Sequence, residues 1–191
     1  MQSVSERLKR IASSRRLVDI KWWIVDAIAC EGGIRLIEGP VIRDATVADG
    51  DAMLALVPRL AAFDVPARRE SHHLWRDDAA LLQRWLSGDG ERCIVQVAEC
   101  GGEVVGFTLT SLRPEPLSHT PAAHLEAIAV AKEAEGRGIA SALLDACEKR
   151  AREKGACFMT LHVFAANERA RAVYEKCGYE GELIRYIKSL D

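Results

Sequence analysis

Two glycines, Gly136 and Gly138, stand between an apolar run that ends at Val130 and a helical pattern that begins at Ile139. Glycine lets the backbone approach a ligand closely, and the first turn of a helix offers unpaired N–H groups and the positive end of the helix dipole. Together these features suit a bound phosphate group. The helix is well supported, because apolar residues recur at helical spacing up to the helix-stopping Gly155. They are Ile139, Leu143, Leu144, Cys147 and Ala151.

The glycine spacing excludes two commoner phosphate-binding loops. The chain has no GxxxxGK[ST] sequence, and the GxG at 136–138 lacks the third glycine of a dinucleotide-binding fingerprint. The plain structural alternative is a glycine-rich turn between a strand and a helix that binds nothing.

A second group of residues follows about 30 positions further on. An alternating strand over residues 157–164 leads into a helical stretch with Asn167 at its start, Tyr174 within it and the pair Gly178-Tyr179 at its end. Taken singly, Asn167 is a good helix N-cap, Tyr174 lies on an apolar helix face and Gly178 stops a helix. Their order after the glycine-rich turn carries more information than any one of them.

Both groups resemble the signatures of the GNAT acetyltransferase superfamily, in which [QR]xxGx[GA] follows a strand and a later helix carries Asn, Tyr and a Gly-aromatic pair. The resemblance covers about residues 41–191. It implies an α/β (α+β mixed) GNAT fold with a central twisted, mostly antiparallel sheet and helices on both faces. The first signature is read at Glu135, Gly136, Arg137, Gly138, Ile139 and Ala140. Glu135 departs from the Gln or Arg of the pattern, which is expected to weaken cofactor binding without abolishing it.

The resemblance implies acetyl-CoA as co-substrate. Its pyrophosphate would be held by backbone amides of the glycine-rich loop, and its pantetheine amides and the developing oxyanion by backbone groups of Ile128, Ala129 and Val130. The implied cofactor-binding set is Ile128, Ala129, Val130, Glu135, Gly136, Arg137, Gly138, Ile139, Ala140, Ser141, Asn167 and Tyr174.

Amide formation from a thioester needs a neutral amine. At pH 7 the removal of a proton from an alkylammonium ion costs about 4 to 5 kcal/mol of free energy. Glu126, in the strand before the loop and on the side of His124 by alternation, is the preferred general base. His124 is the rival base, and a solvent-facing strand glutamate is the structural alternative. Tyr174 corresponds to the family's general acid for the departing thiolate. His162 is expected to be structural or on the surface.

The composition is that of a globular protein with one well-buried core: 191 residues, 49% hydrophobic and 28% charged. A net charge of -2 gives no basic excess for nucleic acid, and no apolar run reaches the ~20 residues that span a bilayer. We therefore predict small-molecule partners, no nucleic acid and no membrane. The six cysteines form no CxxC pair, which predicts reduced thiols, a cytoplasmic location and no metal.

Residues 1–38 differ from the rest in charge, with seven Lys or Arg against five Asp or Glu, whereas residues 39–191 carry 19 against 23. The apolar part is broken by Asp19, Lys21 and Asp26, so it does not read as a signal peptide. Trp22 and Trp23 could belong to an amphipathic docking helix. We favour an N-terminal extension outside the fold, followed by an acetyltransferase domain at 39–191.

The remaining pattern predicts a strand at 41–46, a helix over 49–63 capped by Asp49 or Asp51, and a second helix capped by Asp77. Strands at 92–100 and 104–112 form a hairpin around Gly101-Gly102. By resemblance, the acceptor lies against residues 63–75 and 113–119. Its charge is left open there, because acidic residues (Asp64, Glu70) and basic ones (Arg68, Arg69, His72, His73, Arg76) are mixed.

The favoured function is direct transfer of an acetyl group from acetyl-CoA to a primary amine of a small molecule, in a ternary complex without an acyl-enzyme. Two alternatives stay open. One is acetylation of a protein N-terminus or lysine, and the other is a non-catalytic acyl-CoA-binding regulatory module. Assembly as a homodimer is also left open.

Overall fold

The computed structural model describes residues 39–90 and 92–190. By internal contacts the chain divides into a unit from Met1 to Gly39 and a unit from Pro40 to Asp191. Only the second unit is described below. The predictions for residues 1–38, with Trp22 and Trp23, lie outside the described residues.

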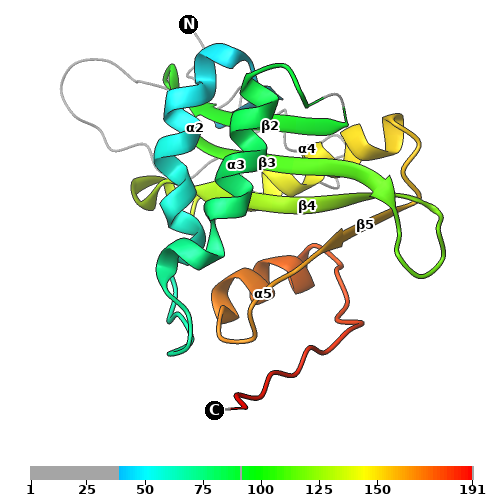
Figure 1. Cartoon of the computed structure of the whole chain (residues 1–191). Helices are drawn as coiled ribbons and strands as arrows, with labels where there is room; N and C mark the ends of the chain where they lie inside the picture. The colour runs from blue at the N-terminus through cyan, green and yellow to red at the C-terminus, as the bar shows by residue number, and fades with distance from the viewer. Residues whose placement is uncertain (1–38, 91, 191) are drawn as a thin grey trace, which may run out of the picture. The chain divides into compact units, whose positions relative to one another are not determined.

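In the described unit, five strands form a single sheet in the order β1-β2-β3-β4-β5 (Figure 1). The pairs β1–β2, β2–β3 and β3–β4 are antiparallel, whereas β4 and β5 are parallel. This confirms the predicted mixed, mostly antiparallel sheet, and the hairpin turn at Gly101-Gly102 has positive φ at both glycines. The strands are β1 (Val41–Asp44), β2 (Cys93–Cys100), β3 (Glu103–Pro114), β4 (Pro121–Val130) and β5 (Phe158–Leu161).

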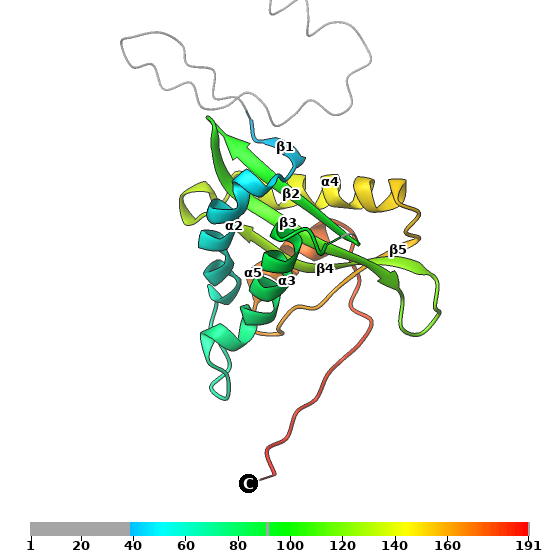
Figure 2. The ribbon, with the colours of Figure 1, turned by 45° about the horizontal axis from the view of Figure 1, so that its top comes forward.

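Helices cover both faces of the sheet, as predicted. Figure 2 shows α2 and α3 on one face and α4 on the other. Met53 and Leu82 pack on the first face against Phe107 and Leu109, while Leu143 and its apolar neighbours of α4 are buried on the second. The longer helices are α2 (Gly50–Leu56), α3 (Arg76–Leu86), α4 (Ile139–Glu153) and α5 (Glu168–Lys176), and the 3-10 helices are η1 (Val47–Asp49), η2 (Val57–Ala61), η3 (Ser71–Leu74) and η4 (Lys132–Ala134).

Several predicted boundaries were wrong, and the strand expected over 41–46 ends at Asp44. The helix expected over 49–63 is α2 followed by η2, and the carboxylate of Asp49 binds Arg43 and Thr46 instead of capping α2. Asp77 lies inside the first turn of α3 rather than before it. The strand expected over 157–164 ends at Leu161, because the following residues leave the sheet and are exposed.

Strand β4 carries one residue more than the facing part of β3. Leu109 pairs with Ala127 and Thr110 pairs with Leu125, which leaves Glu126 as the extra residue of a β-bulge. As a result Leu125 and Ile128 both pack toward α4, while Ala127 packs in the cluster under α2 and α3. The bulge therefore turns Glu126 toward the α3 face of the sheet.

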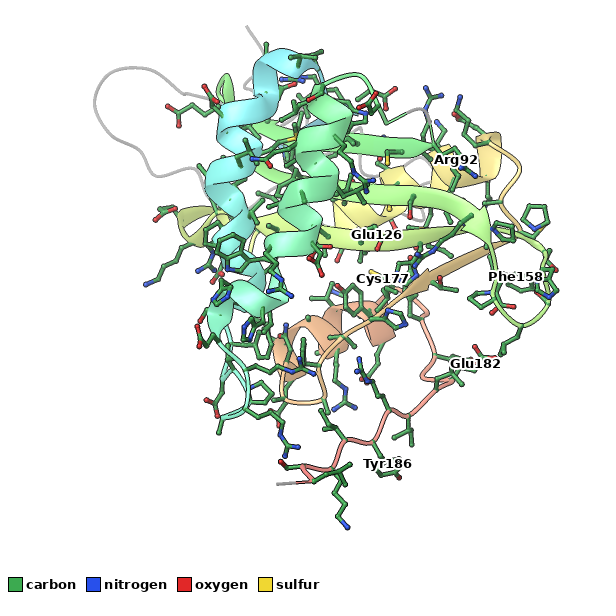
Figure 3. All side chains as sticks on the ribbon, in the orientation of Figure 1. Arg92, Glu126, Phe158, Cys177, Glu182 and Tyr186 are labelled. Atoms are coloured by element: carbon green, nitrogen blue, oxygen red, sulfur yellow. The ribbon has the colours of Figure 1, made fainter. Side chains whose placement is uncertain are left out.

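Helix α5 ends before Gly178, whose φ of 87° fits the predicted stop. Residues 179–190 form neither helix nor strand, and Figure 3 shows Glu182 and Tyr186 on this segment, which leads away from the sheet. Several of its apolar side chains are exposed: Leu183, Ile184, Tyr186, Ile187 and Leu190. In the part of the chain that is described, none of the helices is both long and apolar enough to cross a membrane.

Candidate functional site

A cavity of about 240 Å³ opens where β4 and the chain after β5 separate. The two strands pair only from Ala122 and Phe158 to Leu125 and Leu161. Beyond that point β4 continues to Val130, whereas the segment that follows β5 turns toward α5. The cavity therefore has the second half of β4 on one side and residues 162–164 with α5 on the other. Such a concave space between secondary-structure elements is the usual setting of a ligand site.

The glycine-rich loop opens into one end of this cavity. Gly136 and Gly138 both have φ near +75°, and Gly138 occupies the N-cap position of α4 without any side-chain cap. The first backbone N–H groups of α4 are therefore left for a ligand. Ala140, in that first turn, lines the cavity.

The structure brings only part of the predicted cofactor set to the cavity wall. Ile139 lies in the core with 1% of its surface exposed, so only its backbone could contact a ligand. Gly136, Arg137, Gly138 and Ser141 lie next to the lining without forming it. The predicted residues that do line the cavity are Glu126, Ile128, Ala129, Val130, Glu135, Ala140, Asn167 and Tyr174.

Glu135, the residue that departs from the family pattern, is held by two arginines that sequence reasoning missed. One carboxylate oxygen pairs with Arg59 of η2, and the other lies 2.6 Å from Nη1 of Arg169 in α5. Arg169 first, and then Arg59, keep the pKa of Glu135 below its ordinary value. The Nε of Arg59 also donates to the carbonyl of Val130 at 3.3 Å.

Glu126 lies on β4 (Figure 3), where the bulge places it beside polar groups of β3 and β4. Its carboxylate accepts a hydrogen bond from the hydroxyl of Ser111 and lies 3.6 Å from Nη1 of Arg113. His124 Nε2 is 3.9 Å away, so the two candidate bases lie on one side of the strand as predicted. With 18% of its side chain exposed, Glu126 is accessible from the cavity.

His124 is a weaker candidate base than its ordinary pKa suggested. The ring is buried, and its Nδ1 lies 2.7 Å from the hydroxyl of Thr160. Burial, and then the positive charge of Arg113, lower the pKa of His124 to about 4. A base that weak accepts protons poorly near pH 7. His162, expected to be structural or on the surface, is exposed and also lines the cavity, with its ring 4.8 Å from that of His124.

Tyr174 projects from α5 into the cavity wall and packs edge-on against Tyr179, with 5.9 Å between ring centroids. Burial raises the pKa of Tyr174 to about 12. No described residue forms a hydrogen bond with its hydroxyl. The phenol is therefore protonated at neutral pH and can donate to a ligand.

Asp78, in the first turn of α3, also lines the cavity and was missed from the sequence. Acidic residues are common in the first turn of a helix, so its position in the sequence gives no sign of a site. Burial, and then the nearby charge of Glu126, raise the pKa of Asp78 to about 7. Phe63 and Leu74 of the predicted acceptor region reach the cavity wall. The charged residues named there do not: Asp64, Arg68, Arg69, Glu70, His72, His73 and Arg76.

The surface of η3 holds a group of three potential metal ligands. Glu70, His72 and His73 are exposed, and each offers a ligand atom within 4.8 Å of the others. Glu70 already pairs with His72 at 3.2 Å, and its backbone N–H donates to Nδ1 of His73. These groups therefore satisfy one another outside the cavity.

Replacing Asp78 with asparagine should raise the free energy of unfolding more at pH 8 than at pH 5. The folded pKa of Asp78, about 7, lies above its ordinary value of 3.8, so the folded state binds the proton more tightly. The stability due to this group is complete below about pH 4 and is lost as the pH rises through 7. Asparagine cannot ionise, so the variant does not lose this part of the free energy of unfolding as the pH rises.

Urea unfolding at the two pH values measures this difference. Asp77→Asn is the matched control, because Asp77 is 91% exposed on the same helix turn and is the smallest of the three causes of the raised pKa of Asp78, so its effect should differ much less between the two pH values. Equal effects of Asp78→Asn at pH 5 and pH 8 would contradict the prediction. Besides Asp77, the charged group that acts on Asp78 is Glu126.

The sequence is similar to those of curated acetyltransferases. A mycothiol acetyltransferase of Paenarthrobacter aurescens (strain TC1) is 30% identical over 148 residues, which are 72% of this chain and 45% of that protein. The chain spans between 37% and 55% of the length of the curated relatives it matches.

Solved structures share the fold. A ribosomal-protein-alanine N-acetyltransferase from Brucella melitensis biovar Abortus 2308 superposes with a TM-score of 0.59 at 22% identity, covering 80% of this chain and 100% of that one. The aminoglycoside N-acetyltransferase AAC(6')-Iy, solved in complex with CoA, gives 0.58 at 21% identity, covering 78% and 99%. The model of the acetyltransferase (GNAT) family matches residues 58–179, a range that includes the cavity, the glycine-rich loop and both signatures. The chain belongs to this family, whose co-substrate is acetyl-CoA.

Proposed function

We propose that the chain transfers an acetyl group from acetyl-CoA to a primary amine of a small molecule, by direct attack in a ternary complex. The observation that carries this proposal is that one cavity is lined by the loop end at Glu135 and Ala140, by Tyr174, and by Glu126 with Asp78. Groups suited to a phosphate, to a leaving thiolate and to an amine thus share one space.

Donor binding follows from the separation of β4 and β5. The N-terminus of α4 and the amides around Gly136 and Gly138 suit the pyrophosphate. Among the described residues, no strand lies beside the edge of β4 from Ile128 to Val130 on the cavity side, so its backbone groups suit the pantetheine amides. Val130 contributes its carbonyl to Arg59 in this structure.

Between heavy atoms the reaction forms one bond and breaks one, and one proton passes from the amine to the base. The neutral amine nitrogen attacks the acetyl carbonyl carbon, the C–S bond breaks as the amide bond forms, and the thiolate leaves. We assign to Glu126 the acceptance of the amine proton, directly or through water, because its carboxylate lines the cavity, whereas the buried ring of His124 does not.

Tyr174 donates a hydrogen bond to the departing sulfur. With a tyrosine pKa of about 12 and a thiol pKa near 8.5, complete proton transfer is uphill by about 5 kcal/mol, compared with ~2 kcal/mol for an ordinary phenol. The hydroxyl therefore acts chiefly by stabilising charge on the sulfur as it develops, and solvent completes the proton transfer.

A small cationic acceptor is supported by the walls of the cavity. Asp78 and Glu126 offer two carboxyl groups to an ammonium ion. Phe63 and Phe164, from two separate segments, bring their rings to 5.6 Å between centroids at this wall, which restricts the room for a protein chain. The mycothiol acetyltransferase named above also supports a small acceptor. A cytoplasmic location is supported by the free thiols at Cys93, Cys100, Cys147, Cys157 and Cys177.

Mixing the full chain with acetyl-CoA and a panel of small primary amines should release free thiol at a rate that depends on the amine. Thiol released against time is the measurement, and the same mixture without an amine is the control. If acetyl-CoA binds but no amine or peptide speeds thiol release, the non-catalytic acyl-CoA-binding module replaces the enzyme. Release with N-terminal peptides alone would move the acceptor to a protein.

A further inference from the structure

Three charged side chains from three separate elements meet at the loop end of the cavity. Arg59 comes from η2, Glu135 from the turn before α4, and Arg169 from the first turn of α5. Both arginines contact the carboxylate of Glu135, one on each oxygen. All three residues line the cavity.

The charges of this group favour an anionic ligand. Two guanidinium groups face one carboxylate, so the group carries a net charge of +1 beside the unpaired N–H groups that begin α4. A guanidinium binds phosphate in the same bidentate way as it binds carboxylate, and a phosphate carries more charge. The Arg169–Glu135 pair is also easily exchanged, because 64% of the Arg169 side chain is exposed and exposed ion pairs contribute little.

We propose that Arg59 and Arg169 bind phosphate groups of acetyl-CoA, and that Glu135 is an internal competitor that holds both arginines until the donor binds and then releases them. This inference rests on the proposed function. It explains how the chain tolerates Glu135 at a position where the family pattern has Gln or Arg, since two arginines pair with this carboxylate.

A purely structural role for Glu135 predicts the opposite result. If the carboxylate only orients the arginines, its removal loosens them and weakens donor binding. If it competes with phosphate, its removal frees two positive charges and removes a repulsive one, so donor binding tightens. The sign of the change therefore separates the two roles.

Calorimetric titration of the full chain with acetyl-CoA tests the competition. Glu135→Gln should lower the Kd by about three- to tenfold, and Arg169→Gln should raise it by a similar factor. Arg169→Gln should cost more affinity in the Glu135→Gln background than in the parent, because the arginine then has no internal partner. Arg171→Gln is the matched control: Arg171 is on the same helix, pairs with Glu175 and lies outside the cavity lining.

Ionic strength gives a second readout that a change in folding would not mimic. Log Kd should depend less steeply on salt in Arg169→Gln than in the parent, and should be unchanged in Arg171→Gln. Arg59→Gln repeats the test from η2, should Arg169→Gln melt early. An unchanged or higher Kd in Glu135→Gln overturns the inference, whereas failure of the parent to bind acetyl-CoA overturns the proposed function instead.

Discussion

The Tyr174→Phe protein should turn over acetyl-CoA about 10² to 10³ times more slowly than the parent, while its Kd for acetyl-CoA stays within about threefold. The substitution removes only a hydroxyl that forms no hydrogen bond with any described residue. The ring remains packed against Tyr179 and the cluster around Leu144 and Cys147. Loss of kcat without loss of binding is the pattern of a group that acts only in the transition state.

The measurement is the steady-state rate over pH 6 to 10 with any accepted amine. Because the pKa of Tyr174 is about 12, the phenol stays protonated throughout this range, so the ratio of parent to variant rates should be constant. Tyr179→Phe is the control, since Tyr179 packs against Tyr174 but does not line the cavity. A Tyr174→Phe rate within threefold of the parent would remove the phenol from the mechanism.

The Gly138→Asp protein should bind acetyl-CoA about 10 to 1000 times more weakly. Gly138 stands at the N-cap of α4, so a carboxylate there faces the proposed phosphate position. Two like unit charges 4 Å apart repel by about 4 kcal/mol at an effective dielectric constant of 20, and solvent exposure reduces this value.

Gly138→Asn separates charge from shape, because Asn has the form of Asp, tolerates positive φ and carries no charge. It should retain most of the affinity that Gly138→Asp loses. Ala140→Glu, on the cavity wall, should weaken binding in the same way as Gly138→Asp. Calorimetric Kd values within twofold of the parent for both acidic variants would place the phosphates elsewhere.

Local patterns predicted the parts of the site that depend on nearby residues. Apolar spacing from Ile139 onward identified α4, and the glycines before it identified its open N-terminus. Asn167 caps α5 as expected, with its side chain accepting from the backbone N–H of Ala170 at 3.2 Å. In each case the residues that decide the structure lie within one or two helical turns of one another.

The rest of the site depends on residues that only the folded chain brings together. Arg59 and Glu135 are 76 positions apart, and nothing in either neighbourhood indicates that they pair. Asp78 looks like an ordinary first-turn acid until α3 is placed over β4. The early end of β5 was missed because the alternation of residues 157–164 continues past the last residue that finds a partner strand.

The bulge in β4 governs how this chain can be matched with its relatives. Side chains alternate with period two along a strand, so the one extra residue at Glu126 decides which face every residue before it presents. A relative without that extra residue would turn a different side chain toward the cavity at the same count from the glycine-rich loop. In a sequence alignment, the placement of a one-residue gap in this strand therefore decides whether a relative is assigned a residue equivalent to Glu126.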